Sequence, residues 1–218
     1  MPTYDRPQAL RCGHPGDGRG IVNGIIDESV HAMAQMILEH SVQNPTKFDC
    51  SIQGFGMLRL YLPQDMRLNV WNSRFRIPNV SLIHTHPWNF ESYIERGKLT
   101  NIRYERVDEE PTHECAVIKP GPGGGIMERM GLVSLGMFNP EFYSAGDVYA
   151  QKASEIHLSA PQDGCVTINM RQRVGADEAL VFWPVGEEWI SAEPRRATPD
   201  EVRAFCQTAI EIGAAALI

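Results

Sequence analysis

Two histidines one residue apart, His84 and His86, are the residues of this chain whose type and spacing best suit chemistry. They lie in a segment rich in β-forming residues that ends at a glycine turn, Gly97. Residues i and i+2 of a strand face the same side, so both imidazoles are expected to point into one volume and to share a metal ion. Such a pair also occurs on solvated strands, so the pair alone does not establish a site.

The segment around this pair resembles the first sequence motif of the cupin superfamily. That motif reads G-x5-H-x-H-x3/4-E-x6-G, and His84, His86 and Gly97 match it, whereas Pro78 stands at its leading glycine. The run His-x-His-Pro-Trp-x-Phe-x-Ser is also similar to that of a group of small, mostly uncharacterised cupins.

A later stretch resembles the second cupin motif, which reads G-x5-P-x-G-x2-H-x3-N. Gly146 and His157 match it, with the ten intervening residues that the motif requires. The chain departs from the motif at three positions, where Lys152 replaces the proline, Ser154 the inner glycine and Pro161 the asparagine.

The resemblance covers about residues 55 to 192 and implies a β-sandwich or barrel that buries a metal between strands. The implied ligands are His84, His86 and His157. Three neutral imidazoles are enough to hold a divalent transition metal and to leave coordination positions open for substrate, water or O2. The alternative is a cupin fold that has lost its metal, with the histidines hydrogen-bonded in a polar pocket.

Glu91 is the candidate for a fourth metal ligand, and the sequence leaves its place open. Counting forward from His86 puts Glu91 at the glutamate of the motif, whereas counting back from Gly97 puts Phe90 there. An unbroken strand would turn Glu91 outward, and a bulge at Pro87 would turn it inward. We favour the three histidines alone and keep Glu91 as the fourth ligand of the alternative.

The ligand set bears on the activity and on the metal. A three-histidine cupin site resembles those of thiol and diketone dioxygenases, which use Fe(II) to bind substrate and O2 together. A site with an added glutamate resembles oxalate-type and isomerase cupins that use Mn, Ni or Zn. The favoured hypothesis is a non-haem Fe(II) dioxygenase acting on a small organic molecule. The alternatives are a non-oxidative isomerase, decarboxylase or lyase, and a ligand-binding sensory cupin without catalysis, since one architecture hosts all three.

Arginines are the expected anchors of an anionic substrate, because a planar guanidinium binds a carboxylate with two parallel hydrogen bonds. Arg103 and Arg171 are the predicted catalytic residues of this kind. The position and context of Arg59 resemble those of the carboxylate-binding arginine of thiol dioxygenases, although a surface strand arginine is the simpler interpretation. The other predicted substrate contacts are the apolar wall Trp88 and Phe90, for which core packing is an equal or better interpretation, and the polar strand residues Asn169 and Arg173.

The elements expected to position these residues are mostly strands. Alternating or apolar runs bounded by turn residues predict strands near 54–62, 66–75, 99–106, 126–138, 166–173 and 179–184. A helix is expected over 28–43, after an N-cap at Asp27, and another over 199–212, opened by a capping box from Thr198 to Glu201. We therefore predict one all-β domain, residues 1–218, with an N-terminal extension at 1–47, a cupin-type jelly-roll core at 48–192 and a C-terminal helix at 193–218.

Composition narrows the class of protein. With 218 residues, 43% of them hydrophobic, the chain can bury one sizeable core. A net charge of -7 without a basic run argues against nucleic acid and anionic membranes as partners. Five scattered cysteines without a C-x-x-C predict reduced thiols in a cytoplasmic protein, and no apolar stretch is long enough for a bilayer. Helices outside a β core suggest a homodimer contact, and the expected partner is a small-molecule substrate.

Overall fold

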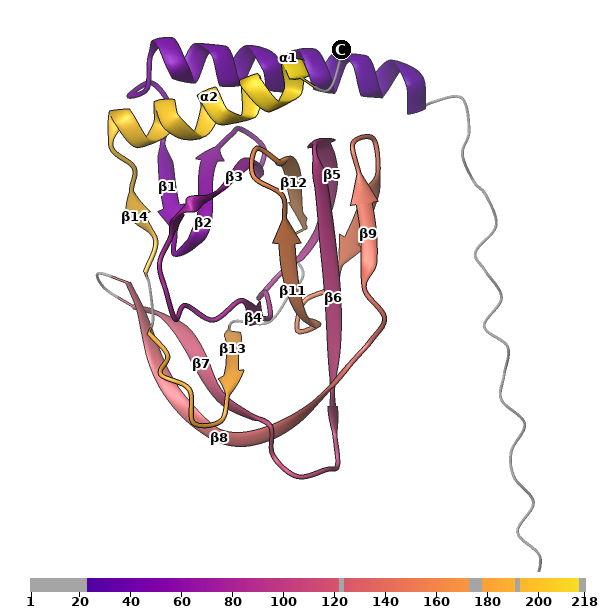
Figure 1. The fold of residues 1–218 in the computed structure, drawn as a ribbon, viewed down its shortest axis with the longest axis vertical. Helices are drawn as coiled ribbons and strands as arrows, with labels where there is room; N and C mark the ends of the chain where they lie inside the picture. The colour runs from indigo at the N-terminus through magenta and orange to yellow at the C-terminus, as the bar shows by residue number, and fades with distance from the viewer. Residues whose placement is uncertain (1–22, 122–123, 173–177, 191–192, 216–218) are drawn as a thin grey trace, which may run out of the picture.

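The computed structural model describes residues 23–121, 124–172, 178–190 and 193–215 of the chain. Strands predominate in these residues and form two antiparallel sheets, with one helix before them and one after them (Figure 1). The sequence prediction of a β-rich fold flanked by terminal helices is confirmed at this level, and the arrangement is compatible with a β-sandwich or barrel.

The first sheet has the strand order β10-β5-β12-β3-β2-β1-β14. All of its neighbouring strands are antiparallel. Its members are β1 (Cys50–Gln53), β2 (Phe55–Tyr61), β3 (Met66–Arg76), β5 (Asn89–Arg96), β10 (Val148–Gln151), β12 (Val166–Gln172) and β14 (Arg195–Arg196).

The second sheet has the order β11-β4-β13-β7-β8-β6-β9, and an additional β11–β6 pairing joins its edge strand to β6. Two consecutive strands of this sheet, β7 and β8, form an antiparallel hairpin. Its members are β4 (Ile83–His84), β6 (Lys98–Val107), β7 (His113–Gly121), β8 (Gly124–Met137), β9 (Glu141–Ser144), β11 (Ile156–Pro161) and β13 (Ala179–Pro184).

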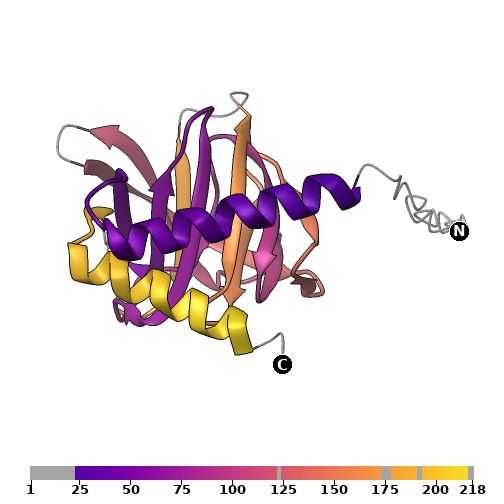
Figure 2. The same cartoon turned by 90° about the horizontal axis from the view of Figure 1, so that it is seen from above.

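Two helices, α1 (Asn23–Gln43) and α2 (Pro199–Ala215), lie side by side across the outer face of the first sheet (Figures 1 and 2). The largest apolar cluster of the described residues fills the space between helices and sheet. Burying each such aliphatic or aromatic side chain contributes about 1.5–3 kcal/mol. Its fully buried members include Leu38 of α1, Phe205 of α2, and Leu58, Leu60, Leu68 and Val70 of the sheet.

The sequence located both helices, with one correction. The capping box is confirmed, because the Glu201 amide donates to Thr198 Oγ1 at 3.3 Å and the Thr198 amide donates to Glu201 Oε2 at 2.9 Å. The first helix starts earlier than predicted, at Asn23, so Asp27 lies inside α1 and does not cap it. Packing of its apolar face stabilises this helix more than a local capping residue does, so the cap signal did not predict where it begins.

Strand alternation gives the first sheet a polar inner face. The outward residues of β2, β3 and β12 belong to the apolar cluster, so their neighbours in sequence point the other way, toward the second sheet. Directly paired residues of antiparallel strands share a face, and the register pairs Arg59 with Asn69, Asn69 with Thr167, and Arg67 with Asn169. The space between the sheets is therefore lined partly by ionisable and amide side chains, which lie beside apolar ones such as Met57, Trp71 and Phe90.

The segment after His84 is not one strand, as the sequence interpretation assumed. Ile83 and His84 form the short strand β4 in the second sheet, whereas β5 in the first sheet begins only at Asn89. The backbone of Thr85 donates to the Leu180 carbonyl at 2.9 Å, and Thr85 Oγ1 accepts from the Leu180 amide at 2.8 Å. These bonds hold the chain while it crosses from one sheet to the other, so His86 lies on a crossover loop.

Gly97 makes the predicted turn, which joins β5 to β6. Its φ is +79°, in the region that favours glycine, and a Cβ there would lie 3.0 Å from the Cα of Cys165. Four cysteines, Cys50, Cys115, Cys165 and Cys206, are buried free thiols, as the sequence predicted, whereas Cys12 lies outside the described residues. Among the residues described, neither helix is long and apolar enough to cross a membrane.

Candidate metal centre

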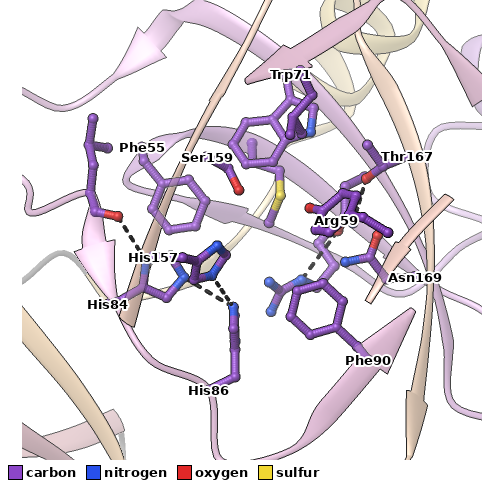
Figure 3. A pocket seen from close by; sticks show the side chains of 15 residues that line it. Phe55, Arg59, Trp71, His84, His86, Phe90, His157, Ser159, Thr167 and Asn169 are labelled. Carbon is purple, nitrogen blue, oxygen red and sulfur yellow. Dashed lines mark hydrogen bonds between the residues drawn. The ribbon is translucent and has the colours of Figure 1, made fainter. Parts of the chain in front are cut away.

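Three histidines from different parts of the chain converge between the sheets (Figure 3). His84 and His157 sit directly opposite each other on β4 and β11, so their rings share a face. His86 reaches the same point from the crossover loop, whose His86 carbonyl accepts a hydrogen bond from the Ser154 amide at 3.0 Å. The Nε2 atoms of His84 and His86 are 3.2 Å apart, and those of His86 and His157 are 3.0 Å apart.

Hydrogen bonds on the far side of two rings fix which nitrogen carries the proton. His84 Nδ1 lies 2.9 Å from the Leu82 carbonyl oxygen, which can only accept, so Nδ1 donates. His157 Nδ1 lies 2.8 Å from Asn101 Oδ1, and Asn101 Nδ2 donates to Glu141 Oε2 at 3.2 Å, which sets the orientation of the amide. Both histidines therefore direct an Nε2 lone pair into the cluster, as metal-ligating imidazoles do.

The environment keeps these imidazoles uncharged. The pKa of His84 is lowered by burial first and by the nearby Arg59 guanidinium. The pKa values of His86 and His157 fall well below 6.5, chiefly through burial and then through the neighbouring histidines and arginines. Metal binding requires the neutral ring, so the site holds its ligands in the competent protonation state near pH 7.

Two of the nitrogen–nitrogen distances in the donor set match those around one metal ion. The three ligand nitrogens all lie within 4.8 Å of one another. Two nitrogens that each lie about 2.1 Å from one ion, at bond angles of about 90–100°, are roughly 3.0–3.2 Å apart, the same as the two close distances here. Without a cation, one N–H of His86 would have to serve the lone pairs of both His84 and His157. The three histidines could therefore bind a metal ion, whose identity the geometry leaves open.

Glu91 is not part of this cluster of potential ligands. The β5–β12 register is regular from Asn89 to Tyr93, and its irregularity falls at Val166 and Thr167. Phe90 lines the chamber beside the histidines, so its neighbour Glu91 faces the opposite side of the sheet, where it pairs with Met170. No bulge turns the carboxylate inward.

The histidines line a chamber of about 50 Å³ between the two sheets. Such a volume holds an ion with a few water-sized ligands. Of the predicted substrate residues, Arg59, Phe90 and Asn169 line it (Figure 3). The Phe90 ring packs edge-on against His86 with centroids 4.9 Å apart, and Asn169 Oδ1 accepts from Ser92 Oγ at 3.1 Å.

Arg59, which the sequence connected to carboxylate binding only by resemblance, does face the site. Figure 3 shows its guanidinium beside the Phe90 ring, on the side of His86. Burial lowers the pKa of Arg59 and an interaction with Tyr61 opposes this, while Arg59 Nε donates a long 3.5 Å bond to Asn69 Oδ1. The simpler interpretation, a surface strand arginine, does not hold, because the inner face of the sheet is the polar one.

Trp88 and Arg171 lie next to each other just outside the chamber. The Arg171 guanidinium carbon is 5.0 Å from the Trp88 ring centroid, and its Nη2 donates to Asp65 Oδ1 at 2.7 Å. Trp88 lines a neighbouring, larger cavity that also reaches His86. Arg173 lies outside the described residues.

Arg103 is placed behind the histidines and lines neither of these cavities. Its guanidinium bonds Glu141 Oε2 at 3.0 Å and Glu155 Oε2 at 2.9 Å, beside a separate cavity of about 300 Å³. The pKa of Arg103 is raised: burial alone would lower it, but the hydrogen bond that Arg103 donates to Glu141 and the negative charges of Glu141 and Glu155 outweigh burial. Arg103 therefore braces Glu141, which in turn holds Asn101 and His157.

Sequence reasoning missed two residues of the site, Asn101 and Arg67. Asn101 is fully buried on a predicted strand, and a buried amide signals a required partner, but His157 lies 56 residues away in sequence. Arg67 was visible only as one residue of an alternating strand, and the sequence did not say which face is the inner one.

No protein-family model matches this chain, and no curated protein matches it either.

Proposed function

We propose that this chain is a metal-dependent cupin enzyme, a non-haem Fe(II) dioxygenase that acts on a small organic molecule. The observation that carries the proposal is the convergence of the Nε2 atoms of His84, His86 and His157, two of them with the lone pair directed inward. An arrangement that only satisfied buried histidines would pair each lone pair with its own donor.

The cupin jelly roll is part of this proposal, and backbone conformations support it. The glycines that match the two motifs, Gly97 and Gly146, both have positive φ values, +79° and +91°. Ser154, at the inner glycine position of the second motif, keeps a glycine-like φ of +65°. Turn geometry thus follows the motifs even where the residue type does not.

The residues of the chain would orient the metal ligands, keep their imidazole rings uncharged and exclude water from one side of the ion. Bound Fe(II) would supply open coordination positions at which an organic substrate and O2 meet. His84 and His157 are held in the ligating tautomer by Leu82 and Asn101. Phe90 covers one side of His86, and Arg59 offers a positive charge to an anionic group.

The position of Glu91 favours this function over its first alternative. A carboxylate facing the histidines would favour the Mn, Ni or Zn cupins with a fourth ligand, and Glu91 faces away from them. A non-oxidative isomerase, decarboxylase or lyase stays second, because an ion on three histidines can also act as a Lewis acid. A sensory cupin that binds a metabolite without turnover is third.

Elemental analysis of protein purified without a histidine tag tests the metal claim. Wild type should carry near-stoichiometric divalent metal, and His84→Ala and His157→Ala should lose most of it. His113→Ala is the matched control, because His113 on β7 lies outside the cluster. Equal trace metal in wild type and both cluster variants would overturn the proposal in favour of metal-free ligand binding.

Oxygen consumption tests the reaction class. Protein loaded anaerobically with Fe(II) should consume O2 with a member of a panel of thiols, diketones and organic acids, and His157→Ala should not. Full metal occupancy without O2 uptake for the whole panel would count against the dioxygenase and favour Lewis-acid chemistry.

A further inference from the structure

Arg67 on β3 is a buried cation with few partners. Only 9% of it is exposed, and its Nε has no hydrogen-bond partner. Among the described carboxylates none forms an ion pair with it. Its guanidinium carbon lies 4.9 Å from the Trp88 ring centroid and 5.6 Å from that of Tyr61. A buried charge without a counter-ion is unfavourable, and an anionic ligand would remove that cost.

Positive charges outnumber negative charges around Arg67. Arg67, Arg59 and Arg171 lie close together: burial first, and then repulsion from the other two arginines, lowers the pKa of Arg67 to about 9, although Tyr61 and Asp65 act in the opposite direction. Asp65 forms an ion pair with Arg171. Arg59 and Arg67 are therefore the two guanidiniums of this group that are left for an anion. Both are on the inner face of the first sheet, where Arg59 lines the histidine chamber.

A cavity of about 340 Å³ is lined by Arg59, by the histidines and by Trp88, against whose ring Arg67 stacks. That volume is within the range of pockets that take small organic ligands, about 300–1,000 Å³. Arg59, His84 and His86 line it, as they line the smaller chamber, so the two spaces meet at the candidate metal centre. The rest of its wall is mainly apolar and includes Val80, Trp88, Val181, Trp189 and Ile190.

We infer that the ligand of this site is an organic oxyanion with an apolar body, its carboxylate or phosphate bound by Arg59 and Arg67 and its body held in the 340 Å³ cavity. In that position the ligand borders His84 and His86, which line the same cavity. That this ligand is also the substrate rests on the proposed function; the binding itself does not require the metal.

Each part of the site excludes one simpler ligand. A free inorganic anion would use the arginines and leave the apolar wall exposed to water. A neutral apolar molecule would fill the cavity and leave Arg67 without a counter-charge. Only a ligand with both parts satisfies both, which is why compounds matched in one part and different in the other decide the question.

Calorimetric titration of chelator-treated, metal-free protein provides the test, since a metal cannot then bind the anion directly. The probes are 4-phenylbutyrate, its uncharged amide, acetate, phenyl phosphate and inorganic phosphate. We expect 4-phenylbutyrate or phenyl phosphate to bind about tenfold or more tightly than the amide and than acetate or inorganic phosphate. The tighter of the two identifies the anionic group. Equal affinity for acid and amide, or for acid and acetate, would overturn the inference.

Arg67→Met removes the charge and keeps most of the side-chain volume. We expect about tenfold or greater loss of affinity for the best anion, with a melting temperature in the absence of ligand equal to or above that of wild type, because an uncompensated buried charge is gone. Arg76→Met, at an exposed position of the same strand, is the matched control and should retain wild-type affinity. Unchanged affinity together with a lower melting temperature would mean that Arg67 only stacks on Trp88 and Tyr61.

The metal content of the same preparations separates this inference from the proposed function. A wild type that never binds metal would defeat the enzyme proposal, while the titrations, made without metal, would still decide on the anion site. Conversely, a wild type with full metal and no preference for charged probes would defeat only the anion site.

Discussion

The two faces of the first sheet differ in what they contribute. Its outer face, with Leu58, Leu60 and Leu68, is apolar, fully buried and covered by α1 and α2. Its inner face, with Arg59 and Arg67, carries charges and amides toward the histidines. The same strands supply both, because successive residues point to opposite sides.

The buried charges of the inner face, which destabilise the fold, thus lie beside the apolar cluster that contributes most to its stability. Buried arginines and histidines weaken a fold unless other burial compensates them. Here the compensation lies one residue away on each strand, where the sheet packs against the helices. The terminal helices, which the sequence suggested as a homodimer contact, thus cover this sheet with their apolar faces, and the dimer stays a prediction.

The largest effect is expected from breaking the outer face. Leu58→Ala should lower the free energy of unfolding by about 2–5 kcal/mol, because a fully buried side chain is replaced by a cavity. The metal content of the folded fraction should stay at the wild-type level, since Leu58 faces away from the histidines. Urea unfolding and elemental analysis measure the two quantities. Metal loss at full stability would contradict the separation of the faces.

A substitution beside the histidines should have the opposite effect: it should weaken metal binding and leave the fold intact. Asn101→Ala should reduce metal affinity about 10–100-fold, because His157 loses the acceptor that fixes its tautomer. Thr167→Val, a near-isosteric change at another buried residue of the chamber, is the control and should keep its affinity. Competition with a chromophoric chelator gives both values. Equal affinities in the two variants would refute the role of Asn101.

Acidification should weaken the fold through the histidine cluster between the sheets. His86 and His157 have pKa values well below 6.5 in the folded protein, so below pH 6.5 the unfolded chain takes up protons that the folded one does not. Stability is then fully present above pH 6.5 and is lost as the pH falls below it, by about 1.4 kcal/mol per pH unit for each such histidine.

Urea unfolding of chelator-treated protein between pH 7.5 and 5.5 measures this loss. His157→Gln should show the shallower slope, because one of the buried histidines with a lowered pKa no longer titrates. Parallel slopes in wild type and variant would mean that His157 protonates as easily in the folded protein as in the unfolded chain.

Local signals in the sequence located most elements and the three histidines. Alternation found β2, β3 and β12, and the capping box found α2. What stayed hidden depends on contacts between distant residues. The crossover after His84 is held by Thr85 and Leu180, 95 positions apart, and nothing local marks it. Equally, alternation separated the polar from the apolar face of β12, but only the docked helices show that the polar one is inside.

The smallest effect tests how the turn beside the interior site is made. Ser154 is exposed and has a φ of +65°, a conformation that costs a residue with a Cβ about 1 kcal/mol. Its amide bonds the His86 carbonyl, and that bond does not need the side chain. Ser154→Gly should therefore raise the free energy of unfolding by about 0.5–1 kcal/mol, reduced by the entropy that glycine adds to the unfolded chain, with metal content unchanged.

Lys152→Gly, in the same turn but without a positive φ, should instead lower stability by a similar amount. A loss of stability in both variants would show that Ser154 does not hold the turn in a glycine conformation in solution.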